Sequence, residues 1–145
     1  MNRDRVLALV VEMTEHWVQD PDSDVVWAGE YEGRLGVRMK QRVRDFTTVW
    51  FDVGDRTMGC EAYVLPSPPQ GREEVFRQCL LRNERAWRVH FAIDGHGDVF
   101  LRGRMPLEAV TAEELDLLLG EVYELVELSF RGLVRAAFGR REKKT

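Results

Sequence analysis

Apolar residues at the beginning of the chain recur with the period of an α-helix. The recurring positions are Val6, Val10, Met13 and Trp17. Successive spacings of four, three and four residues place these side chains on one face of a helix. Pro21 follows in an acidic segment, and a proline ends a helix at or before the residue that precedes it. The pattern therefore predicts a helix over residues 2–19.

The pattern then changes to that of β-strands. Val25-Val26-Trp27 is a short apolar run, and apolar and polar positions alternate with period two over residues 37–43. Residues 46–53 are rich in β-branched and aromatic side chains. Gly54-Asp55 is a hairpin turn signal, so residues 57–65 are expected to form the partner strand.

A proline-rich loop over residues 66–71 separates these strands from a second helix, expected over residues 72–87. The stripe predicted for this helix consists of Phe76, Leu80, Asn83 and Trp87. A second hairpin is expected to follow, with strands over residues 89–93 and 99–102 joined by the turn Asp94-Gly95-His96-Gly97-Asp98.

The last helix has clear signals at both ends. Thr111 can cap the first turn, Glu114 stands at the capping-box position, and Gly139 is a plausible stop. The apolar stripe between them consists of Leu115, Leu118, Leu119, Val122, Val126, Phe130, Leu133 and Ala137. The sequence therefore predicts a long helix over residues 112–138.

The resulting element order is α-β-β-β-α-β-β-α. Strands and helices that occur in separate runs favour an α+β fold, with an antiparallel sheet and helices packed on it. The chain of 145 residues is long enough for one domain with a substantial core. We assign this domain to residues 1–139 and expect residues 140–145 to form a basic, disordered tail.

Composition and charge exclude several classes of protein. The chain is 44% hydrophobic and 32% charged, which is globular usage, and its net charge of −4 disfavours a dedicated nucleic-acid binder. The two cysteines, Cys60 and Cys79, have apolar neighbours and are interpreted as core thiols of a reducing compartment. No apolar run is long enough for a membrane helix, so we expect a cytoplasmic protein without membrane contacts.

No recognisable catalytic signature is present. His16, His90 and His96 do not share metal-ligand spacing, and there is no nucleophile elbow or phosphate-binding loop. The turn Asp94–Asp98 could hold a cation but lacks the glutamate of a calcium loop, so we interpret it as a hairpin turn. We therefore expect no catalytic residues, no metal and no cofactor.

A basic stripe is the first candidate site. Arg38, Lys40, Arg42 and Arg44 alternate with uncharged residues, so a strand would carry all four cations on one face, roughly 6.6 Å apart. Such a face could bind a phosphate backbone or an acidic protein segment. The simpler interpretation, a solvated edge strand protected from aggregation by its charges, is favoured.

The second candidate is an apolar face of the sheet. Val49, Phe51 and Val53 point to one face of their strand, whereas Phe46, Thr48 and Trp50 point to the other. A sheet that is apolar on both sides must be covered on both sides. The candidate protein-interaction surface is Phe46, Trp50, Tyr63 and Phe100. Helices of the same chain or a second subunit could cover it.

Several stretches resemble the YbjN-domain family of bacterial sensory transduction regulators, in its actinobacterial type. They are TTVWFDVGD at 47–55, EAYV at 61–64, LLRNE at 80–84, VHFAID at 89–94, GDVFLRGRMPL at 97–107 and EELDLLLG at 113–120. The resemblance implies a type III secretion chaperone-like fold. Proteins of that fold are typically dimeric, bind segments of other polypeptides and have no enzymatic activity.

The leading hypothesis is therefore a non-enzymatic, chaperone- or adaptor-like module. We expect a homodimer that binds an unidentified partner polypeptide through the apolar face and has a regulatory role. The alternative is binding of an anion or nucleic acid through the basic stripe, and a small enzyme is the least supported hypothesis.

Overall fold

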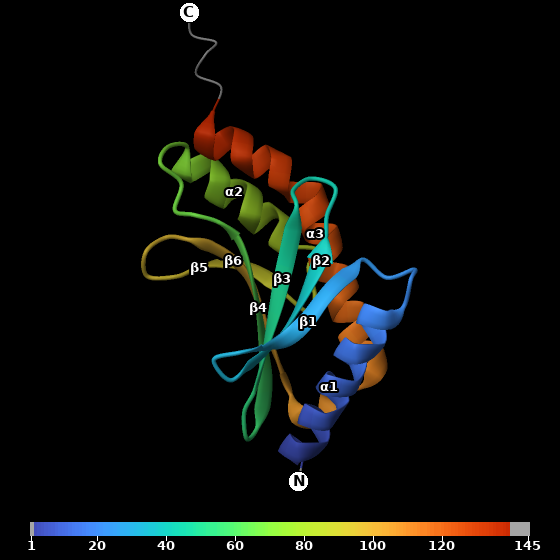
Figure 1. Cartoon of the computed structure of the whole chain (residues 1–145). Helices are drawn as coiled ribbons and strands as arrows, with labels where there is room; N and C mark the ends of the chain where they lie inside the picture. Colours follow the sequence, from blue (N-terminus) through green and yellow to red (C-terminus); the bar gives the residue numbers. More distant parts are fainter. Residues whose placement is uncertain (1, 140–145) are drawn as a thin grey trace, which may run out of the picture.

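Six antiparallel strands and three α-helices make up the computed structural model, which describes residues 2–139 (Figure 1). In chain order the elements are α1 (Asn2–Gln19), β1 (Val25–Tyr31), β2 (Arg34–Lys40), β3 (Phe46–Val53), β4 (Thr57–Leu65), α2 (Arg72–Asn83), β5 (His90–Ile93), β6 (Val99–Pro106), the 3-10 turn η1 (Leu107–Ala109) and α3 (Ala112–Phe138). This is the α+β, single-domain architecture that the sequence predicts. The finer assignment to a chaperone-like fold stays a prediction, and the predicted tail lies outside the described residues.

The strand order is β1-β2-β3-β4-β6-β5, so β1 and β5 are the two edges of the sheet. The first four strands form a meander, whereas α2 and β5 intervene between the neighbours β4 and β6. The register pairs Arg38 with both Trp27 and Thr48, and it pairs Tyr63 with Phe100. These residues therefore share one face of the sheet, although Tyr63 and Phe100 are 37 positions apart in the chain.

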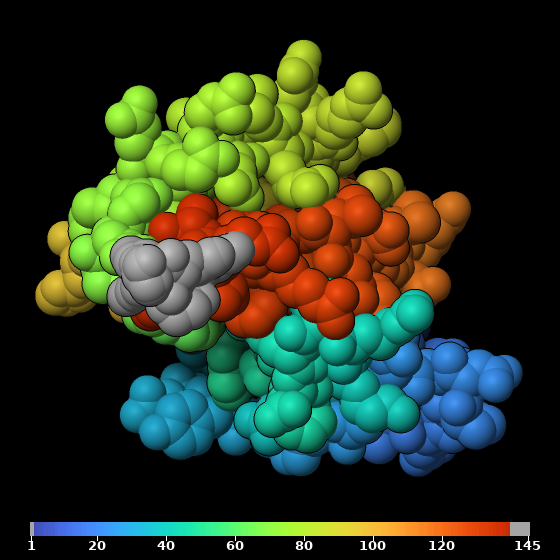
Figure 2. Space-filling view, turned by 90° about the horizontal axis from the view of Figure 1, so that it is seen from above, coloured from blue at the N-terminus to red at the C-terminus, as the bar shows by residue number. Residues whose placement is uncertain are grey.

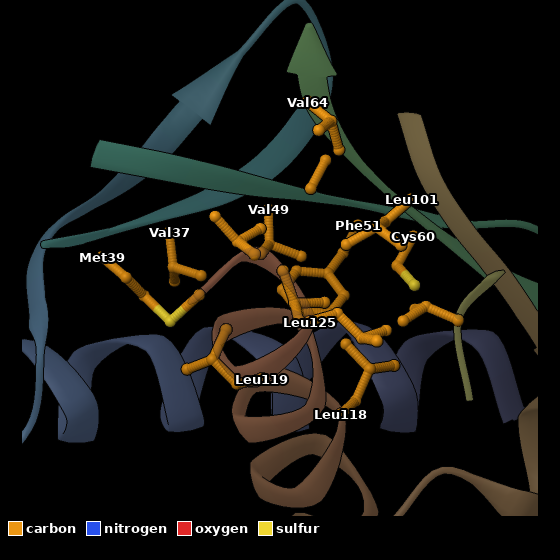
Figure 3. Close-up of a cluster of buried hydrophobic side chains, with 14 of the residues drawn as sticks. Val37, Met39, Val49, Phe51, Cys60, Val64, Leu101, Leu118, Leu119 and Leu125 are labelled. Atoms are coloured by element: carbon orange, nitrogen blue, oxygen red, sulfur yellow. The ribbon is translucent and has the colours of Figure 1, made fainter. Parts of the chain in front are cut away.

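The hydrophobic core lies on the other face. Figure 3 shows side chains of the strands, among them Val37, Val49 and Phe51, pointing toward Leu118 and Leu125 of α3. All of these residues are buried. Strand residues alternate between the two faces, so the buried set on one side leaves the intervening residues on the other.

The helices α1 and α2 complete the same side of the core. Val6 and Val10 of α1 are fully buried, and the indole of Trp17 donates a hydrogen bond of 3.0 Å to Asp116 of α3. The buried residues of α2 are Val75 and Cys79. All three helices therefore pack on one face of the sheet.

The strands differ in two respects from those expected. Four strands rather than three precede α2, because the apolar run at Val25 continues to Tyr31 as the full edge strand β1. The strand expected over residues 37–43 spans Arg34–Lys40 instead. Gln41–Asp45 forms a tight connection to β3, closed by a hydrogen bond from the Gln41 amide to the Asp45 carbonyl.

The second helix differs in its end and in its buried stripe. It ends at Asn83 rather than at residue 87, and two members of the expected stripe, Leu80 and Trp87, are 69% and 77% exposed. Val75 and Cys79 are buried instead, because the helix is rotated so that these positions face α3 and β5. The predicted stripe for α2 is therefore wrong at Leu80 and Trp87, whereas Phe76 packs half-buried against the core.

The predicted signals of α3 are confirmed at both ends. The hydroxyl of Thr111 accepts a hydrogen bond from the Glu114 amide, and Gly139 caps the helix with a positive φ of 67°. The carboxylate of Glu114 does not complete a capping box but pairs with Arg88 at 2.9 Å. Within residues 2–139, no helix has both the length and the apolar character needed to cross a bilayer.

Candidate interaction surface

We call the sheet face that no helix covers the open face. Alternation and register place on it the residues Trp27, Gly29, Tyr31, Arg34, Gly36, Arg38, Lys40, Phe46, Thr48, Trp50, Asp52, Gly59, Glu61, Tyr63, His90, Phe100, Arg102 and Arg104. All four residues of the predicted interaction surface are in this set. The structure thus brings them to one face and shows that no helix of residues 2–139 packs over them.

Two tryptophan rings lie on the sheet above glycines. A methyl group built at Gly36 would lie 2.6 Å from the nearest ring atom of Trp50, and one at Gly29 would lie 2.6 Å from the ring of Trp27. Each indole therefore occupies the space that a side chain at the glycine would need. The two rings meet edge to face, with their centroids 6.4 Å apart. Glycine in β1 and β2 is what allows these rings to lie close to the backbone.

Aromatic side chains continue across the sheet. Tyr63 and Phe100 are direct cross-strand neighbours whose rings meet edge to face at 5.6 Å. Phe46 is 48% exposed and Tyr63 is 45% exposed, although both belong to strands of the sheet interior. Desolvation raises the pKa of the Tyr63 hydroxyl, and the carboxylate of Asp98 acts in the same direction. These rings are the exposed apolar part of the open face.

A charged network lies on the open face. Arg34 makes a bidentate pair with Asp52, at 3.0 and 3.1 Å, and its third contact is with Glu61 at 3.6 Å. Arg102 also pairs with Glu61, at 3.1 Å. Both carboxylates of the open face are therefore neutralised by arginines of neighbouring strands.

Arg38 lies in an environment different from those of Arg34 and Arg102. Its guanidinium lies over the rings of Trp27 and Phe46, at 5.0 and 5.9 Å from their centroids, and Nε donates to the Thr48 hydroxyl at 3.2 Å. Within the described residues, Arg38 has no carboxylate partner. The stacking fixes the guanidinium but leaves its two terminal nitrogens as available donors.

The predicted basic stripe does not form as a single strand face. Only Arg38 and Lys40 lie on β2, which is an interior strand and not the edge strand considered for this segment. The strand ends at Lys40, so Arg42 and Arg44 lie in the connection to β3. The expectation that all four cations share one strand face is therefore wrong.

Arg44 is turned back onto the protein. Its terminal nitrogens donate to the carbonyls of Val64 and Tyr63, each at 2.7 Å, and the guanidinium lies over the ring of Phe130. Burial lowers the pKa of this guanidinium. Arg44 thus connects the loop to β4 and α3, and its donors are not available to a ligand.

Glu127 of α3 holds the same loop from the other side. Its carboxylate accepts hydrogen bonds from the Arg42 amide and the Gln41 side chain, both at 2.7 Å. Figure 2 shows this teal loop against one flank of α3, with α2 against the other flank. The loop therefore belongs to the structural framework of the open face.

The other candidates from the sequence, the turn Asp94–Asp98 and the two cysteines, are part of the folded framework and do not form a site. The Asp94 carboxylate accepts the amides of His96 and Asp98, as in a hairpin turn, and these bonds help to lower its pKa against the effect of desolvation. Cys60 and Cys79 are buried free thiols, and burial raises their pKa values to about 12 and about 11. No group of three or more potential metal ligands occurs within residues 2–139.

The sequence reasoning missed part of the open face and a second apolar surface. Trp27, Gly29 and Tyr31 alternate along β1 and so point to one face, but only the apolar start of this strand is assigned from the sequence. The second surface is a groove of about 560 Å³ between α2 and α3, with Leu81 and Leu128 in its lining. Its two rims come from helices that are 29 residues apart in the chain, so periodicity could not reveal it.

Comparisons with known proteins extend these observations. The model of the YbjN family, described as "Putative bacterial sensory transduction regulator", matches residues 11–134. The uncharacterized proteins Rv0487 of Mycobacterium tuberculosis and Mb0497 of Mycobacterium bovis are each 41% identical over 86 residues, which are 59% of this chain and 47% of each relative. The uncharacterized protein ML2442 of Mycobacterium leprae is 36% identical over 105 residues, which are 72% of this chain and 57% of the relative. The chain thus spans about half the length of these relatives.

Proposed function

Because the chain belongs to the YbjN family, we propose that it is a non-enzymatic regulatory protein that binds a partner polypeptide on its open face. The family description is that of a regulator and not of an enzyme. A regulator without chemistry of its own acts through the proteins that it binds. The open face is the surface on which we place that binding.

The observation that carries the proposal is a row of aromatic rings on an uncovered sheet. Phe46 and Tyr63 are about half exposed, and the rings of Trp27, Trp50 and Phe100 lie beside them. Aromatic side chains supply a large contact area at a small entropic cost, and they are enriched in the cores of protein interfaces. The arginines that stack on these rings add donors at the rim of each apolar contact.

Strand addition at the edge of β5 would meet an obstacle. The side-chain amide of Asn83 donates to the Phe91 carbonyl at 3.1 Å and accepts from the Phe91 amide at 2.7 Å. Asn83 thus takes the place that the peptide group of an added strand would need. We therefore place the partner on the open face and not on this edge.

A pull-down experiment tests the surface. The wild-type chain and a Phe46→Ser, Tyr63→Ser double variant would capture proteins from lysate of the source cell at low and high salt. A Leu81→Ser, Leu128→Ser double variant is the matched control, because these leucines are 54% and 55% exposed and lie on the α2–α3 groove. Circular dichroism and the unfolding midpoint would show that each variant is folded.

We expect the wild-type chain to capture one protein in stoichiometric amount and to keep it through the high-salt wash. The open-face variant should lose this protein, and the groove variant should retain it. Loss with the groove variant and retention with the open-face variant would refute the proposed surface.

We also propose that the chain is a cytoplasmic homodimer with a type III secretion chaperone-like fold, as the family resemblance implies. Light scattering of the purified chain measures the oligomeric state. A mass equal to one chain over a wide concentration range would contradict the dimer.

A further inference from the structure

Arg38 has the geometry of an anchor for an anionic group. Two aromatic rings and the Thr48 hydroxyl fix the plane of its guanidinium, as described above. The two terminal nitrogens have no acceptor among residues 2–139, and a guanidinium presents them as a planar fork that matches a carboxylate or a phosphate. Because the side chain is already ordered, little rotamer entropy remains to be lost when a ligand binds.

The charge of the open face has the same sign as this anchor. The face carries the cations Arg34, Arg38, Lys40, Arg102 and Arg104, against the carboxylates Asp52 and Glu61. The chain as a whole has a net charge of −4, so the excess of cations is a local property of this face. Arg34 and Arg102 neutralise the two carboxylates, which leaves three cations of the face without a carboxylate partner among residues 2–139. Two of them, Arg38 and Lys40, lie beside the exposed Phe46 ring, and the third is Arg104.

The arrangement favours a polypeptide over a nucleic acid as the source of the anion. Base stacking needs free ring faces. Here arginines already lie over the rings of Trp50, Trp27 and Phe100. In the middle of the sheet, Arg34 and Arg102 are paired with the carboxylates of Asp52 and Glu61, so a phosphate backbone would not meet a continuous row of unpaired cations. In the register, Arg38 lies between Trp27 and Thr48 and not opposite either carboxylate, so a single carboxylate of a polypeptide is enough to pair with it.

We propose that the open face binds an acidic polypeptide segment with apolar side chains, in which one carboxylate is held by Arg38 and the apolar side chains pack on Phe46 and Tyr63. This inference rests on the proposed function and specifies the chemistry of the partner. Apolar burial supplies affinity, and the pairing with Arg38 selects segments rich in aspartate and glutamate.

Fluorescence anisotropy with three labelled peptides of equal length tests the inference. The peptides share the same phenylalanine and leucine positions and carry glutamate, glutamine or lysine at the others. A labelled single-stranded DNA of mixed sequence is the fourth probe. Each is titrated with the wild type, Arg38→Gln and Arg77→Gln at low and high salt. Arg77 is an exposed arginine of α2, so its substitution is the control for net charge.

We expect the glutamate peptide to bind the wild type most tightly and to lose about tenfold or more in affinity with Arg38→Gln, because a charge-assisted hydrogen bond is removed. The glutamine peptide should change less than about twofold with the same variant. Arg77→Gln should leave both affinities unchanged. Arg38→Lys, which keeps the charge but removes the fork, should fall between wild type and Arg38→Gln.

Equal binding of the glutamate and glutamine peptides would overturn the inference, as would an Arg38→Gln variant without effect. Binding of the DNA in preference to the glutamate peptide, with loss in Arg38→Gln, would assign the face to a nucleic acid instead. The absence of binding by every peptide would also overturn it. If the lysate partner still depends on Phe46 and Tyr63 in any of these cases, the proposed function stands and only the acidic chemistry is wrong.

Discussion

Replacement of Gly36 by alanine tests the packing of the open face directly. In an ordinary strand this change stabilises a protein, because alanine loses less backbone entropy on folding than glycine does. At Gly36 the added methyl group would lie 2.6 and 2.7 Å from two ring atoms of Trp50. Carbon atoms do not approach so closely, so the indole must move off the sheet. The sign of the stability change is therefore reversed from the usual one.

The magnitude follows from the surface that the indole loses. If the displaced ring exposes about 80 Å² of apolar surface, the lost burial costs about 2 kcal/mol. The lower backbone entropy of alanine returns about 0.5–1 kcal/mol. We therefore expect Gly36→Ala to lower the free energy of unfolding by about 1–1.5 kcal/mol. A chain of this length should then melt about 3–5 °C lower.

Urea unfolding, followed by far-UV circular dichroism, measures this effect against a matched control. Gly59 lies on the same face in β4, and a methyl group there would meet only the Gly103 carbonyl, at 3.8 Å. Gly59→Ala should therefore be neutral or stabilising. In a Trp50→Leu background, Gly36→Ala should lose most of its cost, because the ring that it displaces is absent. A Gly36→Ala protein as stable as the wild type, or a cost that persists with Trp50→Leu, would refute the packing argument.

Three further predictions concern the framework around the open face. Asn83→Ala removes the hydrogen-bond partners of both the Phe91 amide and the Phe91 carbonyl, so it should lower the free energy of unfolding by about 1–2 kcal/mol. Hydrogen exchange of the Phe91 amide should become faster, and unchanged exchange would contradict the role of Asn83. Burial alone would raise the pKa of Glu127, but hydrogen bonds from Arg42, Gln41 and Val43 outweigh it and lower the pKa below the usual 4.5. The stability that Glu127 contributes is thus present above its unfolded pKa and lost as the pH falls through its folded pKa. The urea midpoint of the wild type should therefore fall more between pH 7 and acidic pH than that of Glu127→Gln. Because burial raises the thiol pKa values of Cys60 and Cys79, neither should react with a disulfide reagent at neutral pH until the chain unfolds; rapid labelling of the native protein would show that the core opens.

The local elements were largely predictable because short-range patterns determine them. The apolar stripe of α1 and the cap of α3 at Thr111 are properties of residues within a few positions of each other. Helix signals of this kind do not depend on what the helix packs against. The class of the fold followed from the separation of strand and helix patterns along the chain.

Elements that depend on distant contacts were predicted less well. The rotation of α2, which buries Val75 and exposes Leu80, is set by α3 and β5 and not by its own periodicity. β2 ends at Lys40, and the loop that follows is held by Glu127, a residue far along the chain. A pattern of alternating charges cannot show where such a loop begins.

The sequence by itself determined which side chains could form an apolar surface, because alternation assigns Phe46 and Trp50 to one face of their strand. It could not determine whether that face was covered, since this depends on the side on which the helices pack. Only the tertiary structure decided that all three helices cover the opposite face, and only strand register placed Tyr63 beside Phe100 and Arg38 beside Trp27. The physical reason is that alternation is a property of one strand, whereas coverage and register arise from contacts between segments that are far apart in the chain.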